Sequence, residues 1–336
     1  MLAVDEGEPG LADDAPQHEL DRTADDLGIA GSVAIGVLNE RYGTNLGEAD
    51  QLLFDQFEET WADDDDLAAQ VVRAVLADLP GLPLDLIDDL VLGCAMPEAE
   101  QGLNVARVVG LRAGLPDSSS AVTVNRFCAS GLQAIASVAE RIRVGAIEAG
   151  IAGGVESMSM VPMGGNKAVL NPAVVAERPE IYISMGLTAE NVARKFEVSR
   201  ADQDAFALAS HVKAVAAIAA GRFAGEIVPV TTAEGSTFAV DEAPRADTTL
   251  DALAQLRPVF HALGTVTAGN SSPINDGAAA SVLVSADRAK ALGLRPLARF
   301  VGFAVAGVAP ELMGIGPIAA IPKVLAQTGL TLADID

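Results

Sequence analysis

Cys128 is the residue whose type and setting point most directly to chemistry. It follows a short β-branched run at 121–124, which predicts a buried strand, and it precedes a periodic segment that predicts a helix. A thiol at such a junction lies near unpaired backbone amides and the positive end of the helix dipole, which both favour a thiolate nucleophile. The residues alone leave an alternative open, because most buried cysteines are simply small hydrophobic side chains.

The elements that must position this cysteine are predicted from apolar periodicity. Gly145 stands just past the helical pattern, as a helix C-terminal stop should. A second apolar run at 147–153 predicts the next parallel strand. The residues that recur at helical spacing between these landmarks are Leu132, Ile135, Ala136, Ala139 and Ile142.

The rest of the chain continues this alternation of strands with Ala-rich helices, which predicts an α/β fold. A helix is expected at 67–76, preceded by four aspartates at its positive end. Cys94 lies inside an apolar run, where a core thiol is expected. Strands are predicted at 90–95, 226–232, 280–285 and 298–306, helices at 104–113, 188–196, 199–221, 287–292 and 318–327, and irregular structure at 155–185.

Composition and charge exclude several classes of function. The 336 residues are 50% hydrophobic and 20% charged, with a net charge of −24, which repels nucleic acid and anionic membranes. No apolar run approaches the roughly 18 residues of a membrane span. The two cysteines give neither a disulfide framework nor a metal-ligand cluster, so a reducing cytoplasm is expected.

The acidic charge is concentrated at the N-terminus. Residues 1–66 carry 19 acidic and 2 basic side chains, a net charge of −17, against −7 for the remainder. We expect 1–18 to be disordered, because the segment is acidic and aperiodic. Two amphipathic helices are predicted at 29–38 and 52–61. The stretch 19–61 also resembles the C-terminal tail of type I restriction-enzyme motor subunits, with a small helical extension as the alternative.

From residue 66 onward the sequence carries a long, ordered series of motifs that resembles the thiolases, and among them the 3-ketoacyl-CoA thiolases of fatty-acid β-oxidation. The cysteine segment and the glycine-rich segment are the most specific. The matching segments are DDLVLGCAMP, LNVARVVGLRAGLP, TVNRFCASGLQAIASVAERIR, GGVESMSMVPM, MGLTAENVA, SRADQDAFALAS, EIVPV, LRPVF, GTVTAGNSSPINDGAAA and MGIGPIAAIP.

The resemblance implies a layered αβαβα fold made of two similar halves. Residues 66–158 and 262–290 would form the N-terminal half, 159–261 an inserted loop domain, and 291–336 the start of an incomplete C-terminal half. Residues 1–65 would be an acidic leader, partly disordered or helical. A homodimer or homotetramer in the cytoplasm is implied as well.

The resemblance also implies an activity, acetyl-CoA C-acyltransferase. In this chemistry the Cys128 thiolate attacks the 3-keto carbonyl of a 3-ketoacyl-CoA and acetyl-CoA leaves. The acyl group stays on sulfur until free CoA takes it, and the Cys128 amide is one donor of an oxyanion hole. Coenzyme A would be a co-substrate, with no permanently bound cofactor and no metal.

Residues that contact CoA are implied by the same motifs. Ser272 would hydrogen-bond the pantetheine arm, Ala268 and Phe260 would line it, and Met185 would lie at the tunnel. Arg245 would lie near the nucleotide end, where a guanidinium suits phosphate. Each has a plainer interpretation: core packing for Phe260 and Met185, a turn for Ser272, and an ordinary surface charge for Arg245.

The sequence also departs from the family pattern. Family members continue past residue 336 with Asn-Glu-Ala-Phe, Gly-His-Pro and Cys-x-Gly motifs, which supply a histidine and a second cysteine. His18, His211 and His261 match none of these, and a surface role is expected for each. A first strand resembling Val-Asp-Ala-Val-Arg-Thr-Pro is not apparent before residue 67. We therefore expect a truncated thiolase with an underpaired sheet and impaired or absent turnover.

Alternatives to a degradative thiolase remain open at this point. Within the superfamily they are a biosynthetic acetoacetyl-CoA thiolase or a ketoacyl synthase. From another class, the chain would be a non-catalytic acyl-CoA-binding fragment that keeps Cys128 and the pantetheine contacts. A third possibility is a gene-fusion or assembly artefact that joins a restriction-subunit tail to a truncated thiolase.

Overall fold

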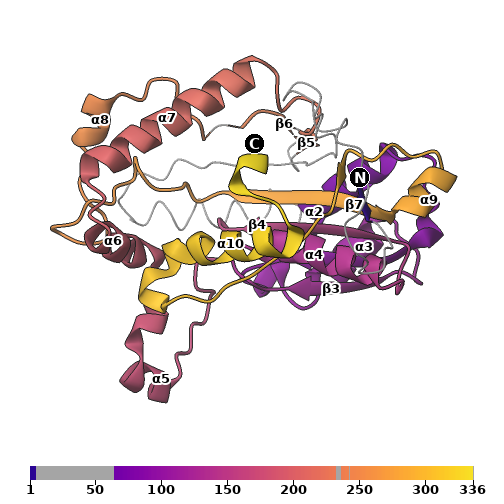
Figure 1. The fold of residues 1–336 in the computed structure, drawn as a ribbon, viewed down its shortest axis with the longest axis horizontal. Helices are drawn as coiled ribbons and strands as arrows, with labels where there is room; N and C mark the ends of the chain where they lie inside the picture. Colours follow the sequence, from indigo (N-terminus) through magenta and orange to yellow (C-terminus); the bar gives the residue numbers. More distant parts are fainter. Residues whose placement is uncertain (5–63, 232–235, 242, 336) are drawn as a thin grey trace. The chain divides into compact units, whose positions relative to one another are not determined.

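The computed structural model describes residues 1–4, 64–231, 236–241 and 243–335, which form two compact units (Figure 1). Both predicted helices within 29–61, and the stretch that resembles a restriction subunit, lie outside the described residues. The division into thiolase halves and a loop domain stays a prediction. Unit 1 comprises Met1–Asn166, Ala224–Asp241 and Asn275–Val301, and unit 2 comprises Lys167–Phe223, Glu242–Ile274 and Gly302–Asp336.

Unit 1 is built on a six-stranded mixed sheet. Its order is β3-β2-β4-β7-β1-β8, and all neighbouring pairs are parallel except β4 with β7. The predicted parallel pairing of the strand after the cysteine helix is confirmed. The strands are β1 (Leu2–Val4), β2 (Ile87–Gly93), β3 (Ser120–Val124), β4 (Ala149–Ser157), β7 (Asp276–Ser285) and β8 (Ala298–Arg299).

Strand β1 corrects two sequence-based expectations. Its three residues pair with β7 on one side and β8 on the other, so the first four residues are not disordered and the sheet does not lack a strand there. Met1 is buried, and its carbonyl oxygen accepts a hydrogen bond from the N–H of Leu297 at 3.1 Å. A three-residue apolar run next to an acidic stretch is too short to show a strand period, which is why it escaped prediction.

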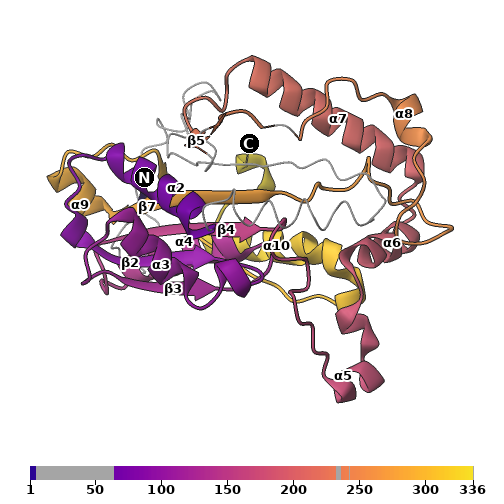
Figure 2. The same ribbon diagram turned by 180° about the vertical axis from the view of Figure 1, so that it is seen from behind.

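Helices cover both faces of this sheet. Helices α2 (Asp64–Ala77) and α3 (Val105–Ala113) lie on one face, and α4 (Ser130–Arg143) packs against β2 and β4 on the other. Figure 2 shows α2 lying across the strands. The two faces alternate along β2, because Leu90 and Leu92 join the α2 cluster whereas Val91 joins the α4 cluster.

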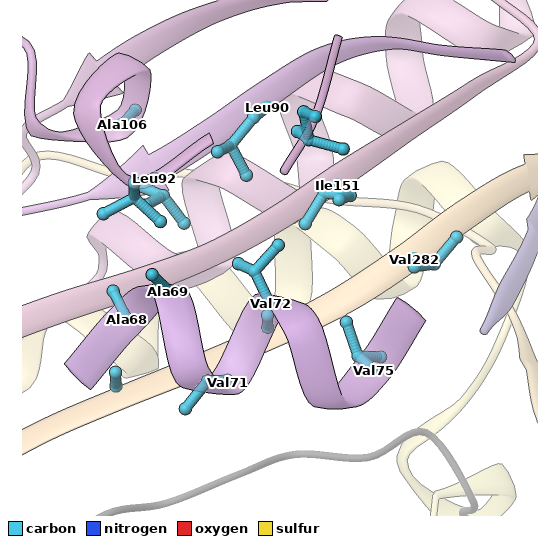
Figure 3. Packing of buried hydrophobic residues seen from close by; sticks show 14 of the residues in the cluster. Ala68, Ala69, Val71, Val72, Val75, Leu90, Leu92, Ala106, Ile151 and Val282 are labelled. Atoms are coloured by element: carbon cyan, nitrogen blue, oxygen red, sulfur yellow. The ribbon is translucent and has the colours of Figure 1, made fainter. Parts of the chain in front are cut away.

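The larger cluster depends on the apolar stripe of α2. Ala68, Val71, Val72 and Val75 recur at helical spacing and are almost fully buried (Figure 3). Their partners on the sheet are the aliphatic side chains of β2, β4 and β7, among them Leu90, Leu92, Ile151 and Val282. The helix predicted after the four aspartates is therefore confirmed, and its stripe holds it on the sheet.

Strand β3 differs from the prediction of a buried strand. It is the last strand on its side of the sheet, and its residues are exposed or half-buried, with Val122 43% exposed. β-Branched residues suit an edge strand as well as a central one, so composition alone could not distinguish the two. Two further strands are shorter than predicted: β5 (Val230–Thr231), which pairs with β6 (Thr237–Phe238), and β8.

Unit 2 is mostly helical. Its long helix α7 (Arg200–Ala219), predicted at 199–221, begins with a capping box in which Ser199 and Asp202 exchange side-chain and backbone hydrogen bonds. The remaining helices of this unit are α5 (Pro172–Glu177), α6 (Met185–Lys195), α8 (Leu250–Ala254) and α10 (Gly316–Thr328), with short 3₁₀ turns at Pro179–Tyr182, Pro310–Ile315 and Leu332–Asp334.

The irregular segment predicted at 155–185 is thus only partly irregular, since β4 runs on to Ser157 and α5 interrupts the loop. In unit 1 the predicted helix at 287–292 is α9 (Ala286–Ala291). Among the described residues, no helix combines the length and apolar character that crossing a membrane requires.

Candidate active site

The N-terminus of α4 approaches the sheet unusually closely, because glycines stand at the end of β2 and in the second half of β4. A Cβ on Gly93 would lie 2.5 Å from both the carbonyl carbon and the Cβ of Ser130, so no other residue fits there without movement. A Cβ on Gly154 would lie 3.2 Å from the carbonyl oxygen of Gly93. These glycines place the start of α4 against the carboxyl ends of two parallel strands, where α/β folds commonly hold their sites.

The turn between β3 and α4 is fixed by two polar side chains. Asn125 donates from Nδ2 to the carbonyl oxygen of Ala95 at 2.8 Å and accepts at Oδ1 from the N–H of Phe127 at 2.8 Å. Ser130 accepts at Oγ from the N–H of Arg126 at 2.8 Å and donates to the carbonyl oxygen of Phe127 at 2.6 Å. Phe127, which directly precedes Cys128, is therefore held by one bond at its N–H and one at its carbonyl oxygen.

Cys128 is presented at the tip of this turn. Its side chain is exposed, whereas Cys94, the other cysteine, is buried as expected of a core thiol. Phe127 has φ +47°, a left-handed conformation that costs a non-glycine residue about 1–3 kcal/mol. The turn thus holds a strained backbone in order to place the thiol one residue before the N-cap position of α4. The interpretation of Cys128 as a small core residue is wrong.

The predicted cysteine helix is present with one difference in its buried face. Ala136, Ala139 and Ile142 are fully buried, but Leu132 is 58% exposed. Gly145 has φ +70° and closes the helix as predicted. Within the first turn of α4, Leu132 is thus exposed whereas Ser130 is buried.

A half-buried polar cluster beside the turn was not found from the sequence. Glu156, at the end of β4, accepts the N–H groups of Ala95 and Met96 at 2.5 and 3.1 Å and the Nε2 amide of Gln101 at 2.7 Å. The Sγ of Cys94 lies 4.0 Å from the same carboxylate. The sequence predicts irregular structure at 155–185, so no strand end was expected at Glu156. Only its position as a single charge beside an apolar run could have indicated that it binds backbone N–H groups.

In unit 2, the structure brings two of the predicted CoA-contacting residues to one place. The three atoms nearest to a Cβ built on Gly186 all belong to the ring of Phe260, so this ring lies against the first turn of α6, which begins at Met185. Met185 and Phe260 are 42% and 41% exposed, which does not fit the alternative of plain core packing.

Ala268 and Ser272 lie on one exposed loop that two buried carboxylates anchor. Glu190 of α6 accepts hydrogen bonds from the N–H groups of Thr265 and Val266 at 2.9 Å each. Asp204 of α7 accepts from Nδ2 of Asn270 at 3.0 Å. The loop is thereby held on both sides of Ala268, by its backbone before this residue and by the side chain of Asn270 after it, while Ala268 and Ser272 are exposed.

Arg245, the fifth predicted contact, is exposed in a loop of the same unit. Its N–H donates to Nδ1 of His211 at 3.1 Å, which ties the loop to α7. His261 accepts in the same way from the N–H of Leu263 at 3.2 Å. Both described histidines therefore accept a backbone N–H, His211 from a distant loop and His261 from its own segment. Cys128 belongs to unit 1 and the five other predicted residues to unit 2.

Over the part of the chain that the structure describes, no group of three or more His, Cys, Asp or Glu side chains is arranged to hold a metal ion. What the described geometry offers is an exposed thiol on a fixed turn and, in the other unit, an exposed loop with an aromatic side chain near it. The exposed thiol of unit 1 by itself suits nucleophilic attack by sulfur on an electrophilic carbon.

Two family models match this chain. The one described as "Thiolase, N-terminal domain" matches residues 52–287, and the one described as "Thiolase, C-terminal domain" matches residues 294–336. Together they span both units and include all six predicted site residues.

Individual relatives agree. A 3-ketoacyl-CoA thiolase of Bacillus subtilis is 53% identical over 283 residues, covering 81% of this chain and 72% of the relative. An acetyl-CoA acetyltransferase of Rhizobium meliloti is 41% identical over 324 residues, covering 92% and 78%.

Two solved structures are similar in fold. The Bacillus anthracis acetyl-CoA acetyltransferase is 39% identical, with a TM-score of 0.70 over 81% of this chain and 72% of its own. The dimeric peroxisomal thiolase of Saccharomyces cerevisiae is 35% identical, with a TM-score of 0.80 over 92% and 76%.

Proposed function

The chain belongs to the thiolase family of acyltransferases, and we propose that it transfers the acyl group of a 3-ketoacyl-CoA to CoA with Cys128 as the nucleophile. The observation that carries this proposal is the exposure of Cys128 on a strained turn at the start of α4. A sulfur nucleophile needs access and a nearby source of positive potential, and the helix N-terminus supplies the second.

The proposed reaction has two half-reactions. The Cys128 thiolate forms a bond to the carbon of the 3-keto group, and collapse of the adduct breaks the bond between C2 and C3 of the substrate. The electron pair of that bond leaves with acetyl-CoA and takes up a proton. The thiolate of CoA then attacks the acyl thioester, and the Cys128 sulfur leaves, so a sulfur group serves both steps.

We assign the CoA contacts to the residues of unit 2. Ser272 would hydrogen-bond the pantetheine arm, and Ala268 would leave room for it, because an exposed methyl side chain is small. Phe260 and Met185 would supply apolar surface to the same arm. Arg245, exposed and cationic, would face the phosphates of the nucleotide end. CoA is then a co-substrate, and the proposal requires no resident cofactor.

Trapping of the acyl-enzyme tests this function directly. The purified chain is incubated with acetoacetyl-CoA or acetyl-CoA, digested, and its peptides are weighed by mass spectrometry. The expected result is one acetyl group on the peptide that contains Cys128 and none on the peptide that contains Cys94. Cys128→Ala should remove the adduct. Absence of any adduct on the unmodified chain, with the thiol shown to be free by alkylation, would overturn the proposal.

The biosynthetic acetoacetyl-CoA thiolase remains a second candidate, because relatives with acetyl-CoA acetyltransferase names also match this chain. It is not better supported than the degradative activity. Acylation rates with 3-ketoacyl-CoAs of increasing chain length separate the two, since a biosynthetic enzyme should accept only the shortest. A non-catalytic acyl-CoA-binding fragment would bind these ligands without forming the adduct.

We also propose that the protein forms a homodimer, or a homotetramer built from dimers, in the cytoplasm. Strand β3 supports a dimer, because it ends the sheet and exposes Val122 on a half-buried strand, an edge suited to cover by a second copy. One of the similar structures is a dimeric thiolase. Light scattering should give at least twice the mass of 34.4 kDa, and cell fractionation should recover the chain with cytoplasmic proteins.

A further inference from the structure

We infer that Glu156 is a positioning residue for Cys128, acting through a chain of hydrogen bonds that passes by way of Ala95 and Asn125. The inference rests on the proposed function of Cys128 as nucleophile. The carboxylate of Glu156 lies near the end of β4. The series of hydrogen bonds runs from there to the segment after β2, and then to the turn after β3.

The first link is the contact of Glu156 with the segment that follows β2. One carboxylate oxygen, Oε2, accepts from the N–H of Ala95 at 2.5 Å, and the other, Oε1, accepts from the N–H of Met96 at 3.1 Å. Bonds to an ionised acceptor are stronger than neutral ones, so this carboxylate holds two consecutive backbone amides firmly.

Gln101 fixes the carboxylate itself. It is fully buried, and its Nε2 donates to Oε1 of Glu156 at 2.7 Å and to the carbonyl oxygen of Met96 at 2.9 Å. Its Oε1 accepts from the N–H of Ser157 at 2.8 Å. The ends of β2 and β4 are therefore joined by one fully used polar network, which leaves the carboxylate a single orientation.

The second link passes from Ala95 to the cysteine turn. The carbonyl oxygen of Ala95 accepts from Nδ2 of Asn125, and Oδ1 of Asn125 accepts from the N–H of Phe127, both at 2.8 Å. Phe127 is the left-handed residue directly before Cys128. A strained conformation persists only where surrounding bonds determine it, and this chain supplies one such bond at the strained residue.

These hydrogen bonds affect the reaction by fixing the position of Cys128. If Ala95 shifts, Asn125 loses its anchor, and Phe127 relaxes toward ordinary backbone angles, which moves both the thiol and the N–H of Cys128. A displacement of about 1 Å in a reacting group costs on the order of 100-fold in rate. Loss of this series of hydrogen bonds should therefore slow acylation of Cys128 by about 10- to 100-fold. The apparent affinity for acyl-CoA should stay unchanged.

Two substitutions break the chain at different links and nearly preserve side-chain shape. In Glu156→Gln, the new amide oxygen can still accept from Met96 and Gln101 at the Oε1 position. Its NH₂ group then faces the N–H of Ala95, so two donors meet and that hydrogen bond is lost. In Asn125→Asp, the acceptor for Phe127 is kept, but an oxygen replaces the donor to Ala95. Because both act on one chain, the double variant should be hardly slower than the slower single variant.

Asp89→Asn is the matched control. Asp89 is a buried carboxylate on β2 that accepts from Oγ of Ser120 at 2.8 Å and pairs with Arg141, at the other end of the strand from Gly93. Loss of the Asp89 carboxylate should lower the stability of the fold but leave the structure of the cysteine turn unchanged. We expect unchanged acylation in this variant at a temperature where all variants remain folded.

The measurement is the rate constant for acylation of Cys128 as a function of acyl-CoA concentration, by quenched-flow mass spectrometry, alongside the rate of alkylation by iodoacetamide. The expected outcome is a lower limiting acylation rate at unchanged half-saturation for Glu156→Gln and Asn125→Asp. An unchanged limiting rate in either variant would overturn the inference, and so would an equal fall in Asp89→Asn. If the unmodified chain is not acylated at all, the proposed function fails instead, and a 10-fold change in alkylation between the variants still tests the positioning role.

Discussion

Both carboxylate oxygens of Glu190 accept a hydrogen bond from the backbone N–H of Thr265, at 2.9 and 3.0 Å. The same carboxylate accepts from Oγ1 of Thr265 at 3.2 Å and from the N–H of Val266 at 2.9 Å. Glu190 is buried, so one acidic side chain of α6 provides most of the anchoring for the start of the loop that carries Ala268 and Ser272.

Replacement of this acid should weaken both the fold and CoA binding. Glu190→Ala leaves the N–H of Val266 buried without its acceptor, which costs about 1–3 kcal/mol of unfolding free energy. We propose that this loop binds CoA; a loosened loop would then have to be ordered again on binding, and a cost of about 1.4 kcal/mol there raises the Kd about 10-fold. Urea unfolding and calorimetric titration with CoA measure the two effects.

Glu177→Gln provides the comparison, because Glu177 is an exposed acid on α5 of the same unit. This variant should match the unmodified chain in both measurements. Equal CoA affinity in Glu190→Ala and the unmodified chain would contradict the anchoring role of Glu190, whatever the change in stability.

The ring of Phe260 occupies the space that a side chain at Gly186 would need. Gly186→Ala should therefore push the ring aside and cost about 1–3 kcal/mol of stability. In a Phe260→Ala background the clash is absent, and alanine in α6 should instead stabilise by up to about 1 kcal/mol, because it forms helix better than glycine. The change of sign across this double-mutant cycle, read from urea unfolding, identifies the contact.

Gly225→Ala is the control for that cycle, since a Cβ there meets open space. Its effect should be small and the same with and without Phe260. If Gly186→Ala were equally destabilising in both backgrounds, the ring would not be the group it displaces.

Much of the fold could be predicted because its signals are local. The stripe of α2, the capping box of Ser199 and the glycine stop at Gly145 are each set by a few neighbouring residues, and the structure has all three. Strand β1 and the edge position of β3 could not be predicted in the same way. Which strand pairs with which depends on distant residues, and a three-residue run such as Leu2–Val4 has no readable period.

In the candidate site, too, residues with a local sequence signal could be predicted, whereas residues that depend on distant contacts could not. Cys128 stood out because its position between a strand and a helix is visible in the sequence, and the structure confirms both elements. Glu156, Glu190 and Asp204 did not stand out, because an acidic residue in a sequence does not reveal that it accepts hydrogen bonds from another segment of the chain. Such anchors are properties of tertiary contact, and only the folded chain brings their partners together.

The amino group of Met1 should make stability depend on pH. Burial lowers the pKa of this amine below its ordinary value of 8.0, since the charged form loses hydration in the folded state. The unfolded chain therefore binds more protons in the window between the lowered pKa and 8.0, so stability rises with pH across that window and falls as pH decreases through it.

Thermal unfolding between about pH 6 and about pH 9 tests this, with the N-terminally acetylated chain as the control. Acetylation removes the titrating group and should remove this contribution, so the difference in Tm between the two forms should shrink as pH rises. A difference that stays constant across the range would show that the amine is as well hydrated in the folded state as in the unfolded one.

Gly145 and Gly307 offer a matched pair for the cost of backbone conformation, because a Cβ at either position meets nothing within 4 Å. They differ in φ, which is +70° at Gly145 and outside the left-handed region at Gly307. Gly145→Ala should therefore destabilise by about 1 kcal/mol, through strain at the end of α4. Gly307→Ala should be neutral or stabilise by about 0.4–1 kcal/mol, because alanine restricts the unfolded chain. Urea unfolding of the two variants measures the difference, and equal effects would mean that α4 does not need its left-handed stop.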